Sequence, residues 1–283
     1  MAIKTVGVVG AGTMGAGIAQ VAAKAGYDVV MRDVADEFVQ RGMSVIEKNL
    51  ARDVKKERMS RADADAVLAR IKGTTELADL SGCDFVIEAI IEKMELKKEV
   101  YRELDKICGP ATYFATNTSG LSVTEMAAAT SRPNKFIGMH FFNPVPVMKL
   151  VEIIKGAETD EDTVSVAEEL ARSMGKECIR VNEAPLFAVN RILVPMINEA
   201  MFVLMEGVAS AEDIDKGMML GANHPIGPLA LADLIGLDTL LMVCETLYTE
   251  TGDSKYRPCP LLRKMVRAGH LGRKTGRGFY NYN

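Results

Sequence analysis

The chain is poor in the residues that build metal centres and disulfide frameworks. It has three histidines, no tryptophan, and five cysteines that form no C-x-x-C pair. Three histidines leave little room for a histidine-based metal site. An odd number of cysteines without paired spacing argues against a zinc site or a disulfide framework. We therefore expect no bound metal and a reducing compartment, by default the cytoplasm.

The chain also lacks a long apolar run and a strong charge of either sign. No stretch approaches the ~20 apolar residues that span a bilayer. Residues 1–12 lack the cleavage pattern of a signal peptide, so we expect them to contain a first strand. The net charge of −4 offers no general attraction to nucleic acid or to a membrane surface. With 283 residues, 48% hydrophobic and 25% charged, the composition predicts a soluble globular protein of two domains.

From residue 3 to about residue 183, short β-branched runs alternate with longer helical patterns. The predicted strands, each taken with the start of its loop, are residues 5–12, 28–33, 85–91, 113–119 and 136–140. Such alternation is typical of βαβ units, which form a mostly parallel sheet with helices on both faces. Continuous apolar strands such as Val29–Met31 suit a sheet buried on both sides. We predict an α/β, Rossmann-type domain over residues 1–184.

Beyond Pro185 the pattern becomes helical and rich in methionine. Residues 186–207 carry apolar side chains at helical spacing, with Pro195 as a predicted kink. The sequence SAED at 210–213 indicates a helix start, and residues 230–248 form another helical region. We predict an all-helical C-terminal domain over residues 185–283.

The first predicted strand runs into a G-x-G-x-x-G motif formed by Gly10, Gly12 and Gly15. These glycines allow a tight turn, close approach of a pyrophosphate, and close helix–strand packing. The whole loop is predicted to hold a dinucleotide: Gly10, Ala11, Gly12, Thr13, Met14 and Gly15. A purely structural glycine turn is the alternative.

Asp33 ends the second predicted strand, eighteen residues after Gly15. A carboxylate at that place can accept hydrogen bonds from the adenosine ribose and would repel a 2′-phosphate, so NAD is favoured over NADP. The neighbouring Arg32 could accommodate the phosphate, which leaves NADP open.

Polar side chains follow the ends of successive predicted strands. They are Glu92 and Lys97, then Asn117, Thr118 and Ser119, then His140 and Asn143. Each alone has an ordinary interpretation as a loop or capping residue. Because ligands bind beyond the carboxyl ends of parallel strands, their recurrence indicates one shared cleft.

The segment GMHFFNPVPVMKLVEII, residues 138–154, carries His140 and Glu152, each six residues from Pro146. A hairpin centred on that proline would set them side by side, and a buried glutamate needs such a partner. Histidine exchanges a proton near neutral pH, and a carboxylate fixes its tautomer. Beside a dinucleotide, the pair could accept a hydroxyl proton during hydride transfer. A structural histidine is the alternative.

The helix after the second strand has a basic face. Lys48, Arg52 and Lys56 are spaced four apart, with Asp53 and Glu57 interleaved. This face could bind a phosphate-bearing part of a substrate, or it could be a solvated, salt-bridged surface.

These motifs together resemble the 3-hydroxyacyl-CoA dehydrogenases, and most closely their short bacterial 3-hydroxybutyryl-CoA members. The resemblance covers nearly the whole chain. It is carried by GAGTMGAGIAQ, VIEAIIEKMELKK, TNTSGLSVTEMA, GMHFFNPVPVMKLVEII, FAVNRILVPMINEA, EDIDKGMMLGANHPIGPLALADLIGLD and LGRKTGRGFYNY.

The resemblance implies a role for each matching residue. His140 matches the catalytic base, Glu152 its acidic partner, and Ser119 and Asn190 the residues that hold the substrate's oxygens. The implied cofactor contacts are Glu92, Lys97, Ser119, Asn143 and Lys274, and the implied CoA contacts are Arg52 and Lys56. Some relatives place a serine near CoA where this chain has Asn49, which puts that contact in doubt.

The implied activity is NAD(H)-dependent interconversion of acetoacetyl-CoA and (S)-3-hydroxybutyryl-CoA, in butyrate or fatty acid metabolism. The implied assembly is a homodimer or higher homo-oligomer formed through the helical domain. Two alternatives stay open: an L-gulonate-type hydroxyacid dehydrogenase of the same superfamily, and a non-enzymatic NADH-binding protein.

Overall fold

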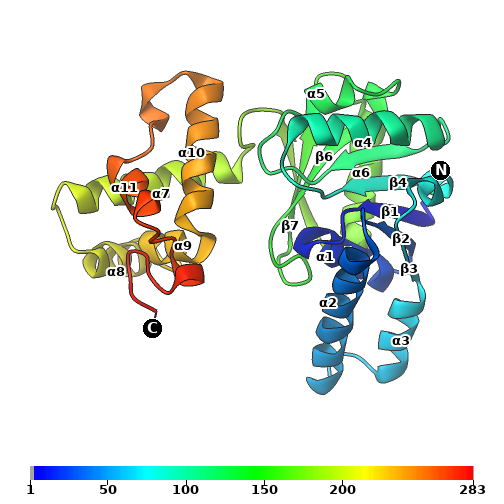
Figure 1. Ribbon diagram of the computed structural model, residues 1–283, viewed down its shortest axis with the longest axis horizontal. Helices are drawn as coiled ribbons and strands as arrows, with labels where there is room; N and C mark the ends of the chain where they lie inside the picture. The colour runs from blue at the N-terminus through cyan, green and yellow to red at the C-terminus, as the bar shows by residue number, and fades with distance from the viewer. Residues whose placement is uncertain (1–2, 283) are drawn as a thin grey trace. The chain divides into compact units, whose positions relative to one another are not determined.

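The structure is a computed structural model that describes residues 3–282. The chain divides into two compact units, Met1–Glu183 and Ala184–Asn283 (Figure 1). Each unit has its own hydrophobic core, so each is described by itself.

The first unit is built on a sheet whose strands follow the order β3-β2-β1-β4-β5-β6-β7-β8. Its strands are β1 (Thr5–Val9), β2 (Asp28–Arg32), β3 (Ile71–Thr74), β4 (Phe85–Glu88), β5 (Tyr113–Thr116), β6 (Phe136–Phe141), β7 (Leu150–Lys155) and β8 (Glu177–Asn182). All neighbouring strands pair in parallel except β6 and β7, which are antiparallel. The predicted mostly parallel sheet is thus confirmed.

Helices cover both faces of this sheet (Figure 1). They are α1 (Thr13–Lys24), α2 (Asp36–Lys55), α3 (Arg61–Ala69), α4 (Met94–Ile107), α5 (Val123–Ala127) and α6 (Glu161–Ser173). On one face, apolar residues of α1 and α6 such as Ile18 and Leu170 share a core with the strands. On the other face, Tyr101 of α4 packs its ring against Phe114 and Phe136. The strands are therefore buried from both sides, as their apolar runs predicted.

Three strands were not among the predicted runs: β7, which only the predicted hairpin about Pro146 implied, and the two edge strands β3 and β8. β3 and β8 form the two edges of the sheet, and most of their residues are exposed or half-buried. An edge strand needs little apolar surface, so neither segment has the apolar run that marked the central strands.

Within residues 184–282 the second unit is helical. Its helices are α7 (Val189–Met205), α8 (Ala211–Gly221), α9 (Pro228–Ile235), α10 (Leu237–Thr251) and α11 (Pro260–Arg267). The predicted helix start at 210–213 is confirmed, because Ser210 accepts a 3.1 Å hydrogen bond from the Asp213 N–H and caps α8. α7 continues through Pro195. The helical region predicted at 230–248 is confirmed, and within it Gly236, with φ +101°, separates α9 from α10.

Among the described residues, no helix has both the length and the apolar character needed to cross a membrane. The five cysteines are all free thiols.

Candidate active site

The glycine loop joins β1 to α1, and each of its three glycines occupies a different environment. Gly10 has φ +106° and donates a 2.7 Å hydrogen bond to the carbonyl of Arg32. A Cβ on Gly15 would lie 1.8 Å from the Gly10 carbonyl oxygen, so α1 can approach β1 only with glycine there. A Cβ on Gly12 would meet no protein atom within 4 Å. Packing inside the chain therefore does not require glycine at position 12.

The open space at Gly12 lies where a dinucleotide phosphate is expected. Gly12 is the N-cap of α1, and no side chain among the described residues caps this helix start. Its first N–H groups and the helix dipole can serve an anion instead. Asp33, just beyond β2, accepts 2.7 Å hydrogen bonds from the N–H groups of Ala11 and Val34, which fixes its carboxylate beside the loop. The loop therefore fits a dinucleotide.

The histidine–glutamate pair is built by the β6–β7 hairpin. His140 and Glu152 are directly opposite in the antiparallel register, which confirms the pairing predicted from their spacing about Pro146. His140 Nδ1 lies 2.7 Å from Glu152 Oε2, and both side chains are buried. An ionised carboxylate only accepts hydrogen bonds, so this contact places the imidazole proton on Nδ1 and leaves Nε2 as the basic nitrogen of the neutral ring. The ring of Phe142 packs on the imidazole, with centroids 4.5 Å apart.

A pocket of about 300 Å³ lies at the carboxyl ends of the central strands. It is lined by Met14, Ala89, Ile90, Glu92, Asn117, Ser119, His140, Phe141, Phe142 and Asn143. The predicted shared cleft is present, because side chains from the ends of β4, β5 and β6 line the same pocket as Met14 of the glycine loop.

Lys97 lies behind this pocket and does not line it. Its side chain is 1% exposed, and its ammonium lies 2.6 Å from Glu88 and 3.2 Å from Glu92. Glu92 in turn accepts hydrogen bonds from the Thr118 hydroxyl and, at 2.9 Å, from the Ser119 N–H. Lys97 therefore contributes by holding Glu92, and its direct contact with a cofactor stays a prediction.

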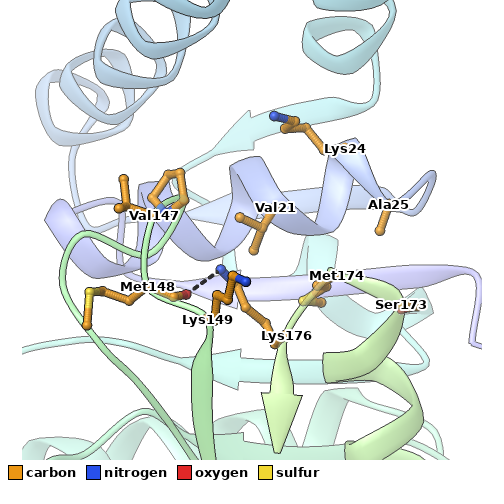
Figure 2. Close-up of a pocket in the computed structure, with 11 residues that line it drawn as sticks. Val21, Lys24, Ala25, Val147, Met148, Lys149, Ser173, Met174 and Lys176 are labelled. Atoms are coloured by element: carbon orange, nitrogen blue, oxygen red, sulfur yellow. Dashed lines mark hydrogen bonds between the residues drawn. The ribbon is translucent and has the colours of Figure 1, made fainter. Parts of the chain in front are cut away.

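The loop between β6 and β7 is held in place by Lys176, which directly precedes β8. Figure 2 shows its ammonium reaching the Met148 carbonyl, a 2.9 Å hydrogen bond, and it donates a second bond of 2.5 Å to the Val145 carbonyl. Burial and the charge of Lys24 lower the pKa of Lys176. Lys176, whose two hydrogen bonds we call the Lys176 clamp, lines a pocket of about 390 Å³ together with Lys24 and Lys149.

Removing this clamp should destabilise the first unit. We expect Lys176→Ala to lower the free energy of unfolding by about 1–3 kcal/mol, because two carbonyls of the loop lose their donor. Lys149→Ala removes an exposed lysine of the same pocket and should change it by less than about 0.5 kcal/mol. Chemical denaturation measures both variants. Equal stability of the two would show that the clamp contributes nothing.

The predicted basic face is present on α2 and on Lys56, its C-cap residue. Lys48, Arg52 and Lys56 are exposed, and in the described part of the chain no carboxylate pairs with them. Asp53 instead pairs with Lys24 at 3.5 Å and Arg58 at 3.9 Å. Arg52 donates a 3.1 Å hydrogen bond to Asn49 Oδ1. The face is therefore solvated without ion pairs to these three cations, and its binding of a ligand stays a prediction.

Asn190 and Lys274, the other residues implied by resemblance, belong to the second unit. Asn190 lies in the first turn of α7 and is half-buried. Lys274 forms an ion pair with Asp238, at 2.5 and 2.7 Å from its two oxygens. Their contacts with substrate and cofactor stay predictions.

The sequence reasoning missed Glu88, Ala89, Ile90, Phe141 and Phe142. The last four line the pocket, and the buried Glu88 supports it. One sequence feature could have identified Glu88, because an acid there directly ends an apolar strand. No such feature marked the apolar residues beyond their position next to the strand ends.

One pocket brings together a dinucleotide loop and a buried histidine–carboxylate pair. An oxidoreductase that transfers hydride to a nicotinamide requires both features. Residues 5–184 match the family model described as 3-hydroxyacyl-CoA dehydrogenase, NAD binding domain, and residues 187–282 match the C-terminal domain of the same family. The chain belongs to the 3-hydroxyacyl-CoA dehydrogenase family. Its cofactor is NAD, and it is an NAD-dependent oxidoreductase.

Individual relatives agree with this assignment. The chain is 54% identical over 282 residues to the probable 3-hydroxybutyryl-CoA dehydrogenase of Bacillus subtilis, covering 100% of this chain and 98% of that one. It is 41% identical over 287 residues to the human mitochondrial hydroxyacyl-coenzyme A dehydrogenase, covering 99% and 91%. Among solved structures, (S)-3-hydroxybutyryl-CoA dehydrogenase from Ralstonia eutropha matches with a TM-score of 0.98 and 56% identity over the full length of both chains.

Proposed function

We propose that the protein interconverts acetoacetyl-CoA and (S)-3-hydroxybutyryl-CoA with NAD(H). The observation that carries this proposal is the buried His140–Glu152 pair, 2.7 Å apart at the wall of the pocket that the glycine loop also lines. The relatives named above as 3-hydroxybutyryl-CoA dehydrogenases support the choice of substrate.

In the oxidation, His140 removes the proton of the 3-hydroxyl group, and in the reduction the protonated imidazole returns it. We assign the exchange to Nε2, because Nδ1 is bonded to Glu152. The Glu152 carboxylate keeps the neutral ring in the tautomer that accepts at Nε2 and stabilises the imidazolium. Ser119, which lines the same pocket, and Asn190 are proposed to orient the substrate oxygens so that the reacting atoms are aligned.

NAD, when bound, supplies the hydride acceptor or donor for the C3 carbon of the substrate. Residues 10–15 are proposed to hold its pyrophosphate, Asp33 its adenosine ribose, and Glu92 and Asn143 its nicotinamide half, with Lys97 and Lys274 as further contacts. The guanidinium of Arg32 is directed at the Thr75 carbonyl, 3.0 Å from its Nε. This hydrogen bond supports the preference for NAD over NADP.

The exposed cations on α2 are proposed to bind the phosphates of the CoA nucleotide. We expect Lys56→Ala to raise KM for acetoacetyl-CoA by about three- to tenfold and to leave kcat nearly unchanged, because a distant contact contributes mainly to ground-state binding. Steady-state kinetics measures both constants. Arg61→Ala, which removes a surface arginine paired with Asp65 on α3, is the matched control. An unchanged KM in the Lys56 variant would argue against a CoA site here.

The decisive experiment compares NADH oxidation with acetoacetyl-CoA, longer 3-ketoacyl-CoA thioesters, free acetoacetate and L-gulonate-type acids, and repeats it with NADPH. We expect the CoA thioester with NADH to be preferred. Faster turnover of a free acid would favour the gulonate-type alternative, and NADH binding without turnover of any substrate would favour a non-enzymatic protein.

We further propose a homodimer or higher homo-oligomer formed through the helical unit, in the cytoplasm. Large apolar side chains on that unit support the assembly, including Ile192 at 73% and Leu220 at 77% exposure. The five free thiols support a reducing compartment. Light scattering on the purified protein measures the assembly.

A further inference from the structure

A buried acidic residue next to the pocket has no part in the proton transfer described above. Glu88 ends β4 and is 0% exposed. Its Oε1 accepts from the Lys97 ammonium at 2.6 Å and from the Ile90 N–H at 2.7 Å, and its Oε2 accepts from the Thr116 hydroxyl at 2.9 Å. The Tyr101 hydroxyl lies 3.4 Å from the same Oε2. Burying a carboxylate is costly unless it is paired and hydrogen-bonded, and these donors meet that requirement.

Glu88 and Glu92 share Lys97, so the three side chains form a charge triad with one cation between two anions. Lys97 Nζ lies 2.6 Å from Glu88 and 3.2 Å from Glu92. The triad therefore carries one net negative charge. Only Glu92 of the three lines the pocket, and none of the lining residues that the structure describes is a lysine or an arginine. The pocket thus meets the anionic end of the triad, while the cation lies behind it.

This arrangement distinguishes the two forms of the cofactor. The nicotinamide ring is cationic when oxidised and neutral when reduced, so a net negative charge in a buried wall attracts only the oxidised ring. We infer that Glu88 is a positioning residue that holds Lys97 and, through it, Glu92, and that the resulting net negative triad favours NAD⁺ over NADH. The inference rests on the proposed place of the nicotinamide beside His140 and Glu92.

The test measures dissociation constants of NAD⁺ and NADH, by calorimetry and by fluorescence, in the whole protein without a second substrate. Glu88→Gln keeps the size and an acceptor oxygen but makes the triad neutral. We expect the ratio Kd(NADH)/Kd(NAD⁺) to fall about tenfold, the size expected for one charge acting over roughly 10 Å at an effective dielectric constant of about 20.

The double variant Glu88→Gln/Lys97→Met is the matched control. It removes the same carboxylate but restores one net negative charge, so the ratio should return to within about threefold of the wild-type value even if both affinities fall. If Glu88→Gln does not fold, Lys97→Met at pH 8 replaces it, and the ratio should rise, because the triad then gains negative charge.

A purely structural role of Glu88 would weaken both forms equally. A ratio that stays within twofold of wild type in every folded variant would therefore overturn the inference. Since no turnover is measured, that result would leave the proposed function intact. Loss of all NAD⁺ and NADH binding in the wild-type protein would instead remove the proposed function, and the inference with it.

Discussion

His140→Gln is expected to lower turnover of acetoacetyl-CoA by ~10²-fold or more, the effect of losing a general acid and base. NADH binding should stay intact, because the glycine loop and Asp33, which are proposed to hold the dinucleotide, follow β1 and β2 rather than β6. Glutamine keeps a polar side chain opposite Glu152, so the hairpin register should survive. Stopped-flow or steady-state NADH oxidation measures turnover, and fluorescence titration measures binding.

The matched control is His270→Gln, which changes a histidine of the second unit just beyond α11. It should retain normal turnover and normal NADH binding. Near-normal turnover in the His140 variant would remove the proposed mechanism. Loss of NADH binding in that variant would show instead that the substitution had disturbed the fold of the pocket.

The second large effect is expected from a pair of substitutions in the glycine loop. Gly15→Ala puts a methyl carbon 1.8 Å from the Gly10 carbonyl oxygen, an overlap that only a backbone shift can relieve. We expect it to lower the free energy of unfolding by about 3 kcal/mol or more and to abolish NADH binding with it. Thermal unfolding and fluorescence titration measure the two losses.

Gly12→Ala is the matched partner, because the same methyl group there meets no protein atom and the backbone, with φ −68°, is favourable for alanine. Its thermal stability should equal that of the wild type. Its Kd for NADH should nevertheless rise at least about tenfold, because the methyl group enters the space in front of the α1 N-terminus. Normal NADH affinity in this variant would mean that the pyrophosphate binds elsewhere.

Much of the site could be predicted from local sequence. The glycine loop was visible because a turn followed by a close helix–strand contact restricts the residue type at Gly10 and Gly15. The histidine–glutamate contact was visible because, in an antiparallel hairpin, residues equidistant from the turn lie opposite each other, and 140 and 152 are equidistant from Pro146.

Other parts were missed for identifiable physical reasons. The edge strands β3 and β8 are exposed, so their residues are not selected for burial and leave no apolar pattern. The break at Gly236 was overlooked because apolar spacing continues across it, although the backbone turns there with a positive φ.

The amino-acid sequence alone determined the α/β and helical halves, the dinucleotide loop and the hairpin pair, because each depends on residues within one or two adjacent elements. Only the tertiary structure decided which groups the buried ammonium groups of Lys97 and Lys176 contact. Glu88 and Lys97 come together because α4 packs on the sheet beside the end of β4, and Lys176 reaches the hairpin loop because β8 pairs alongside β7. Spacing along the chain does not encode such contacts, because they follow from how separate elements pack.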